Sequence, residues 1–180
     1  MDVSQAIRTR RSIRKYKQET VPHEVIESIV ADAAYAPSWK NTQIARYILV
    51  EDRATIDKMA EEMVLDFKFN EKTLKSCAAL MVLTYITGRS GFERDGSYAT
   101  PKEAGFEMFD AGIAAQTFCL AAHEAGLGTV IMGIWDEDGI TKLLDFPKDQ
   151  ELAALIAIGY PDIHPDAPGR KSVDELLTYR

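Results

Sequence analysis

The sequence predicts an α/β or α+β protein whose central sheet is covered by helices on both faces. Two continuous apolar runs of strand length, residues 79–86 and 152–159, are typical of strands buried on both faces. Apolar residues recur at helical spacing over 22–35, a further helix is expected over 54–69, and the longest helical pattern, 103–125, is rich in glycine and alanine. These patterns do not reveal the order of the strands.

Local signals place the other elements. A short helix over 4–9 follows Asp2, a good N-cap residue. Pro22 suits the first turn of the helix over 22–35, and Pro37 ends it. Gly126 suits the position just after the long helix. The remaining expectations are strands over 46–50 and 128–134, a helix over 137–144, a long loop over 88–102 of the kind that forms lids, and a polar tail over 160–180 with a helical turn at 173–177.

Length and composition predict one domain over residues 1–180 and a cytoplasmic location. The net charge of −7 argues against a nucleic-acid binder, which would need a basic face. We expect no membrane partner, because there is no signal-peptide pattern and no apolar stretch of about 18 residues. Cys77 and Cys119 lie in apolar surroundings, which indicates buried thiols in a reducing compartment rather than a disulfide.

The first motif is Arg10-Arg11-Ser12-Ile13-Arg14, in a basic cluster of an otherwise acidic chain. In an extended segment Arg10, Ser12 and Arg14 share a face, with about 13 Å between the outer two. Guanidinium forks with a hydroxyl between them suit the phosphate and carbonyl edges of an elongated ligand. The alternatives are a solvated basic stretch and arginines paired with the protein's own acids.

The second motif is the polar loop Pro37-Ser38-Trp39-Lys40-Asn41-Thr42-Gln43 between a helix and a strand. The carboxamides of Asn41 and Gln43 match the edge of a heteroaromatic ring, because each donates and accepts hydrogen bonds. Trp39 either stacks on such a ring or caps the core. By itself the pattern is also that of an ordinary helix-to-strand connection.

Other segments add weaker signals. Gly133 follows an apolar strand and would let a ligand approach the backbone, although 124–133 lacks the G-x-G-x-x-G of a dinucleotide fold. Arg170 and Lys171 suit a phosphate, or else belong to an exposed tail. Asp110, on the apolar helix, is expected to be a buried, hydrogen-bonded group. The histidines lack metal-ligand spacing and no nucleophile motif is present, so a metal-free protein whose chemistry belongs to a cofactor is favoured.

Taken in order, these motifs resemble the nitroreductase family of FMN enzymes. The matching segments are Arg10–Arg14, Ala36–Ser38 with Asn41 and Gln43, Asp110–Gln116 running into Ala125–Thr129, Ala157–Pro161, and Arg170–Leu176. The resemblance covers essentially the whole chain. It implies a three-layer α+β fold, with a mixed central sheet flanked by helices, in an intertwined homodimer with FMN at the subunit interface.

The resemblance also implies the cofactor site and the reaction. The implied FMN-binding residues are Arg10, Arg11, Ser12, Arg14, Pro37, Ser38, Trp39, Asn41, Gln43, Met132, Gly133, Arg170 and Lys171. The polar loop would come from the second subunit, and Met132 and Gly133 would offer backbone N–H groups near flavin N5. NADH or NADPH would deliver hydride to N5 in a ping-pong cycle, and no side chain would act as acid or nucleophile. The acceptor would be a nitroaromatic, a quinone or a related small molecule.

One departure from the family pattern stands out. Many relatives carry Pro-Trp after the glutamine of the second motif, whereas this chain has Ile44-Ala45, which alters the wall near the flavin. The loop over 88–102 is the expected lid. The alternatives are a dehalogenase-like or flavin-cleaving enzyme on the same scaffold, and an FMN-binding module without catalysis.

Overall fold

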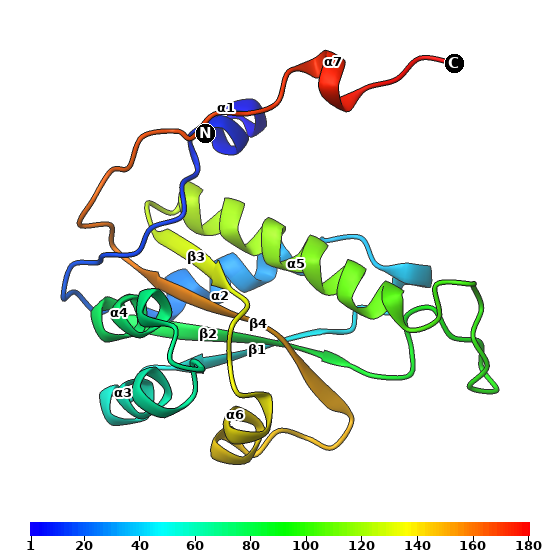
Figure 1. The fold of residues 1–180 in the computed structure, drawn as a ribbon, viewed down its shortest axis with the longest axis horizontal. Helices are drawn as coiled ribbons and strands as arrows, with labels where there is room; N and C mark the ends of the chain where they lie inside the picture. Colours follow the sequence, from blue (N-terminus) through cyan, green and yellow to red (C-terminus); the bar gives the residue numbers. More distant parts are fainter.

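The structure is a computed structural model that describes residues 1–180, with one four-stranded sheet in the order β1-β2-β4-β3 (Figure 1). The strands are β1 (Ala45–Val50), β2 (Ala79–Ile86), β3 (Gly128–Met132) and β4 (Gln150–Gly159). Neighbouring strands pair antiparallel throughout. The one parallel pairing is an isolated bridge between Ser12 and Thr129. The predicted α+β class is confirmed, and the sheet is mixed only through that bridge.

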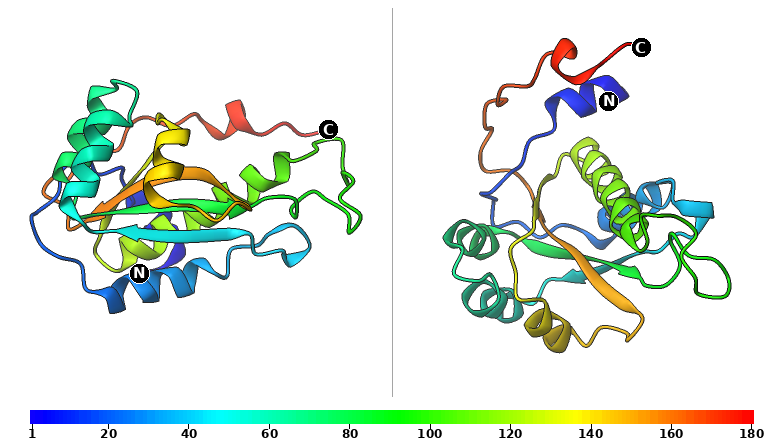
Figure 2. Two further views of the ribbon diagram at one scale, coloured as in Figure 1. Left: turned by 90° about the horizontal axis from the view of Figure 1, so that it is seen from below. Right: turned by 45° about the vertical axis from the view of Figure 1, so that its right-hand side comes forward.

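Helices cover both faces of the sheet, as predicted (Figure 2). One face carries α2 (His23–Ala33) and α5 (Gly105–Glu124), and the other carries α3 (Arg53–Glu62), α4 (Lys68–Ser76) and α6 (Glu137–Leu144). Met81 and Leu83 of β2 pack toward the first pair of helices, while Leu80 and Val82 pack toward the second group. Every residue of β2 is buried, so its apolar run marks a central strand between two helix layers.

Helix α5 crosses its face of the sheet with small residues and one aromatic ring. Its core contacts are Ala111, Ala115, Phe118, Cys119 and Ala122. Two acidic side chains on the same helix, Glu107 and Asp110, are also buried. Met108 and Phe109 lie exposed on its outer side. Asp110 is therefore the buried polar group that the sequence predicted.

The helix predicted over 54–69 is wrong in one respect, because two helices occupy this region. Helix α3 ends at Glu62 and α4 begins at Lys68. Between them Leu65 and Asp66 have positive φ angles of 48° and 57°, which end a right-handed helix. The carbonyl oxygen of Met63 accepts a hydrogen bond at 2.9 Å from the N–H of Asp136, far away in sequence.

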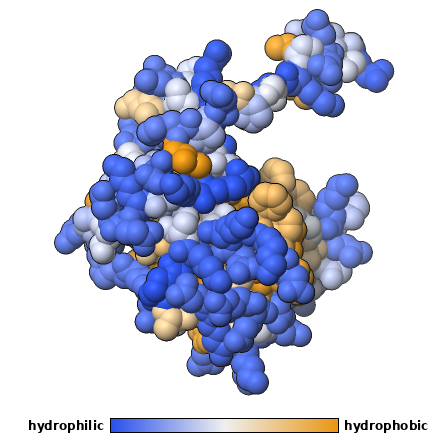
Figure 3. Space-filling model, turned by 60° about the vertical axis from the view of Figure 1, so that its left-hand side comes forward, coloured by the Kyte–Doolittle hydropathy of each residue, from blue (hydrophilic) through white to orange (hydrophobic).

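The N-terminal helix packs against the end of α5, where the Met1 amino group lies 2.6 Å from Glu124 Oε1, whereas the C-terminal end projects from the body. Helix α1 (Val3–Thr9) is capped by Asp2, as predicted, and α7 (Val173–Leu176) lies on an extended C-terminal arm, residues 161–180. Residues 164–180 are all exposed, and Figure 3 shows α7 as a separate lobe on a thin stalk. Cys77 and Cys119 are buried free thiols, as predicted. None of the helices has the length and apolar character needed to cross a membrane.

Candidate functional site

The arginine segment, residues 10–14, lies along the outer edge of β3. Ser12 forms its parallel bridge with Thr129, and the N–H of Ile13 donates to the Thr129 carbonyl oxygen at 2.9 Å. Ile13 is buried against Gly128. Because side chains alternate along an extended segment, burial of Ile13 directs Ser12 and Arg14 to the opposite side, where they line a cavity.

That cavity, called here the cationic cavity, has a volume of about 290 Å³. Its lining consists of Arg10, Arg11, Ser12, Arg14, Pro165, Asp166, Pro168 and Arg170. Of the nine ion pairs in the chain, none involves these four arginines. The hydrogen bonds of three of them go only to backbone carbonyls, such as that from Arg170 Nη1 to the Pro168 oxygen at 2.8 Å. The paired-arginine alternative is therefore wrong, and this donor set fits a phosphate.

A second hollow, the β3 groove, adjoins the cationic cavity and shares Arg14 with it. The groove has a volume of about 500 Å³ and is lined by Arg14, Phe67, Phe69, Asn70, Thr73 and the segment from Val130 to Ile134. It thus contains Met132 and Gly133, two predicted site residues. The N–H of Gly133 has no acceptor within the chain. A Cβ added at Gly133 would meet nothing closer than Trp135 Cζ3 at 3.9 Å, so a ligand has room to reach this backbone.

Asn70 in this groove was missed by the sequence analysis. It lies on α4, is 7% exposed, and donates from Nδ2 to the Ile134 carbonyl oxygen at 3.1 Å. It therefore fixes the chain that follows β3 and lies on the same groove wall as Gly133. An available signal was its place on the buried face of α4, three and four residues before Thr73 and Leu74. A polar side chain among core positions calls for a partner.

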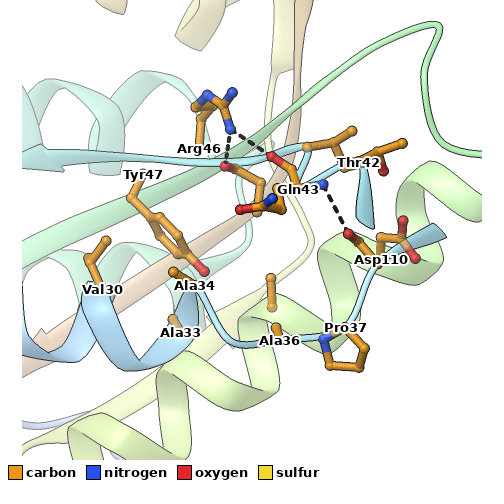
Figure 4. A pocket seen from close by; sticks show the side chains of 14 residues that line it. Val30, Ala33, Ala34, Ala36, Pro37, Thr42, Gln43, Arg46, Tyr47 and Asp110 are labelled. Carbon is orange, nitrogen blue, oxygen red and sulfur yellow. Dashed lines mark hydrogen bonds between the residues drawn. The ribbon is translucent and has the colours of Figure 1, made fainter. Parts of the chain in front are cut away.

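The polar loop, residues 37–43, borders a third hollow, the β1 cavity, shown in Figure 4. Its volume is about 550 Å³. The lining residues come from α2 (Val30, Ala33, Ala34), the loop and its start (Ala36, Pro37, Ser38, Thr42, Gln43, Ile44), β1 (Ala45, Arg46, Tyr47) and α5 (Asp110, Ala114). The buried hydroxyls of Thr42 and Tyr47 have no hydrogen-bond partner. Burial raises the pKa of Tyr47 to about 12, so this hydroxyl keeps its proton.

Three predicted site residues lie outside the hollows. Trp39 packs against Phe106 of α5, with ring centroids 4.5 Å apart, so within the chain it covers α5 and does not line the β1 cavity. Asn41 is exposed at the tip of the polar loop. Lys171 is exposed on the C-terminal arm, next to Arg170 but outside the cationic cavity.

The predicted site residues form two groups at opposite edges of the sheet. The arginine segment and the β3 groove lie at β3, whereas the polar loop leads into β1, and these two strands are the outer ones. Three strand spacings, roughly 14 Å, separate outer strands in such a sheet. One chain therefore does not bring the polar loop to the groove.

Comparisons with known proteins identify the family of this chain. The sequence model of the nitroreductase family matches residues 7–160. A Methanothermobacter thermautotrophicus protein, provisionally named an NADH dehydrogenase/NAD(P)H nitroreductase, is 34% identical over 92% of this chain and 80% of its own. An iodotyrosine deiodinase from Thermotoga neapolitana is 26% identical over 85% of each chain.

Solved structures show the same fold. A nitroreductase family protein from Streptococcus pneumoniae superposes with a TM-score of 0.86 at 18% identity, covering 99% of this chain and 100% of the other. A structure from Desulfovibrio desulfuricans, provisionally described as a nitroreductase in complex with FMN, has a TM-score of 0.78 at 27% identity and covers 100% of this chain and 97% of its own. With the family match over most of its length, this chain belongs to the nitroreductase family.

Proposed function

We propose that this chain is an FMN-dependent oxidoreductase that uses NADH or NADPH to reduce nitroaromatics, quinones or related acceptors. The observation that carries the proposal is the junction of the cationic cavity with the β3 groove at Arg14. Four arginines without acidic partners lie on one side, and a free backbone N–H lies on the other. A ligand with a phosphate at one end and a flat polar ring at the other matches both ends. Support also comes from the FMN bound in the Desulfovibrio desulfuricans structure.

Each group of residues has a distinct part in this proposal. Arg10, Ser12, Arg14 and Arg170 bind the phosphate and sugar-like chain of FMN, with Arg11 and Lys171 nearby. Bound FMN would supply two-electron redox chemistry at its N5 position, taking hydride from NADH or NADPH and returning it to the acceptor in a ping-pong sequence. The Gly133 N–H donates a hydrogen bond to the ring edge, and the positive charge of Arg14 favours a more anionic ring. The chain itself contributes binding, orientation and electrostatics.

We further propose a homodimer in which residues 1–180 form one FMN-binding domain and each site combines two chains. The polar loop and the β3 groove lie at opposite edges of one sheet, so a second copy is needed to bring Pro37, Ser38, Trp39, Asn41 and Gln43 to the flavin. The exposed C-terminal arm, with Val173, Leu176 and Leu177 uncovered, offers apolar surface for a partner. We place the protein in the cytoplasm, where its two free thiols stay reduced.

The experiment that tests the function is an absorbance spectrum of the purified protein, followed by anaerobic addition of NADH and then NADPH. Flavin bands that bleach with one nucleotide, and return when a nitroaromatic or quinone is added, would establish the reductase and its donor. A protein that takes up no flavin, even after reconstitution with FMN, would refute the proposal. Sedimentation analysis of the same sample tests the dimer.

A second candidate is reductive dehalogenation of an aromatic substrate on the same scaffold. The observation in its favour is the similarity to the Thermotoga neapolitana iodotyrosine deiodinase. Release of iodide from iodotyrosine by the reduced protein, compared with its turnover of nitroaromatics, separates the two reactions. Flavin bands that no nucleotide bleaches would instead favour a binding module without catalysis.

A further inference from the structure

We infer that Asp110 is a positioning residue that holds the polar loop and the 87–104 loop on one carboxylate oxygen. Asp110 lies on α5 and is 4% exposed. Its Oδ2 accepts a hydrogen bond from the backbone N–H of Trp39 at 2.8 Å and a second one from the Ser90 hydroxyl. Figure 4 shows Asp110 on α5, next to Thr42 in the polar loop. Each donor belongs to a different loop.

The polar loop needs such an anchor because its backbone is strained. Lys40, Asn41 and Gln43 have φ angles of 45°, 56° and 50°, a left-handed conformation that residues other than glycine rarely adopt. Within the loop, Ser38 Oγ accepts from the Gln43 N–H at 2.9 Å. Asp110 supplies a hydrogen-bond acceptor from a rigid helix outside the loop. A carboxylate suits this role, because charged acceptors form the stronger hydrogen bonds.

The 87–104 loop, which contains the expected lid, also contacts the polar loop close to Asp110. Besides the Ser90 hydrogen bond, Lys40 Nζ lies 3.0 Å from Glu93 Oε1, which ties one loop directly to the other. Trp39 also rests on Phe106, at the start of α5 immediately after the 87–104 loop. The Lys40 ion pair is exposed and contributes little by itself. The buried carboxylate is therefore the main link between the two loops.

This inference rests on the proposed function, in which the polar loop lines the flavin. Although Asp110 borders the β1 cavity, its part under that proposal is to hold the two loops and not to take part in the reaction. It sets flavin affinity through Trp39 and access to the site through Ser90. The two effects are separable, because Ser90 belongs to only one of the two loops.

The test compares matched variants of the full-length protein. Asp110→Leu removes the hydrogen-bond acceptor but keeps a side chain of similar size. Asp110→Asn keeps an oxygen that can accept hydrogen bonds from both donors. Ser90→Ala removes one donor. Glu107→Leu is the control, because Glu107 is a buried carboxylate on the same helix that accepts from the Gly88 N–H at 2.6 Å and does not contact the polar loop. A Trp135→Phe background leaves Trp39 as the only tryptophan.

Three readouts are followed: FMN affinity by titration, Trp39 fluorescence, and trypsin cleavage in the 87–104 loop, which contains Arg89, Arg94 and Lys102. We expect Asp110→Leu to weaken FMN binding about tenfold or more, to shift the Trp39 emission and to accelerate cleavage. Asp110→Asn should restore all three to near wild type. Ser90→Ala and Glu107→Leu should accelerate cleavage only.

Two results would overturn the inference: unchanged Trp39 emission and cleavage in Asp110→Leu, or a Glu107→Leu variant that reproduces all of its effects. If Asp110→Leu frees both loops while FMN affinity stays unchanged, the anchor stands and the proposed flavin contact of the polar loop fails. If Asp110→Leu does not fold, Ser90→Ala carries the test, and unchanged cleavage in that variant would reject the link.

Discussion

Ser12 and Thr129 pair as parallel neighbours, so an isolated bridge holds the arginine segment along the edge of β3. The next residue, Ile13, fills the space above Gly128: a Cβ at Gly128 would lie 2.6 Å from Ile13 Cγ1 and 2.8 Å from Ile13 Cβ. The glycine is thus what allows the arginines to lie this close to the sheet.

Substitution of Gly128 should therefore displace the arginine segment. We expect Gly128→Ala to lower stability by about 1–3 kcal/mol, because the β-branched Ile13 has little rotamer freedom to move away. It should also weaken FMN retention. Urea unfolding and flavin absorbance after dialysis measure the two effects. Gly105→Ala is the control, since its added Cβ meets only Lys102 Cβ at an ordinary 3.7 Å. Equal behaviour of the two variants would contradict the prediction.

Removal of the unpaired arginines should weaken FMN binding and leave the stability of the fold unchanged. Arg14→Ala is expected to weaken FMN binding roughly 10- to 100-fold, the value of a charge-assisted hydrogen bond. Arg10→Ala combined with Arg170→Ala should weaken it more. Stability should stay within about 0.5 kcal/mol, because none of these arginines leaves an acid unpaired. The exposed Arg94→Ala is the control. Full flavin occupancy in all variants after exhaustive dialysis would show that the site is assigned wrongly.

Ala45 should control the size of acceptor that the protein takes. It lies on the wall of the β1 cavity, and the family resemblance implies a larger side chain at this position. We expect Ala45→Trp to lower kcat/KM for two-ring quinones more than for one-ring quinones, because an indole ring would occupy part of the cavity. Steady-state kinetics with both acceptors measures the ratio. Ala54→Trp, on the exposed surface of α3, is the matched control. An unchanged ratio would place the acceptor away from this cavity.

Glu107 should make stability depend on pH. Burial raises the pKa of this carboxyl above its ordinary value of 4.5, so the folded state holds the proton more tightly than the unfolded state does. The linked stabilisation is present below pH 4.5 and is lost as pH rises through the folded-state pKa. Glu107→Gln can still accept the hydrogen bond from the Gly88 N–H, but its side chain does not titrate in this range. The wild type should therefore lose stability relative to this variant as pH rises from 4 to about 7.

Thermal unfolding across that pH range measures the difference between the two proteins. Glu62→Gln, at an exposed position of α3, should show no comparable trend. A wild-type protein that gains stability relative to Glu107→Gln as pH rises would contradict the assignment of burial as the cause.

Elements determined by local pattern were predictable from the sequence, and those determined by distant contacts were not. The apolar run of β2 and the helix over 137–144 match the structure to the residue. The break between α3 and α4 was missed, because Met63 and Val64 continue the apolar pattern and the contact from Asp136 comes from elsewhere in the chain.

The candidate site also has features that local patterns predict and features that depend on distant contacts. The clustering of Arg10, Ser12 and Arg14 followed from strand alternation, and the structure places them together with Arg170. Neither the buried anchor of Trp39 on Asp110 nor the position of Asn70 in the β3 groove could be read from spacing, because each depends on how separate elements pack. The separation of the two groups across the sheet depends on strand order, which the patterns did not contain.

The position of the two groups at opposite sheet edges has a genetic consequence. If each site joins the β3 edge of one copy to the β1 edge of the other, a copy damaged in the arginine segment and a copy damaged in the polar loop complement each other. Their mixed dimer has one site with both defects and one with neither. Two variants that are inactive alone would then regain about a quarter of wild-type activity after random mixing, since half of the dimers are mixed and half of their sites are intact.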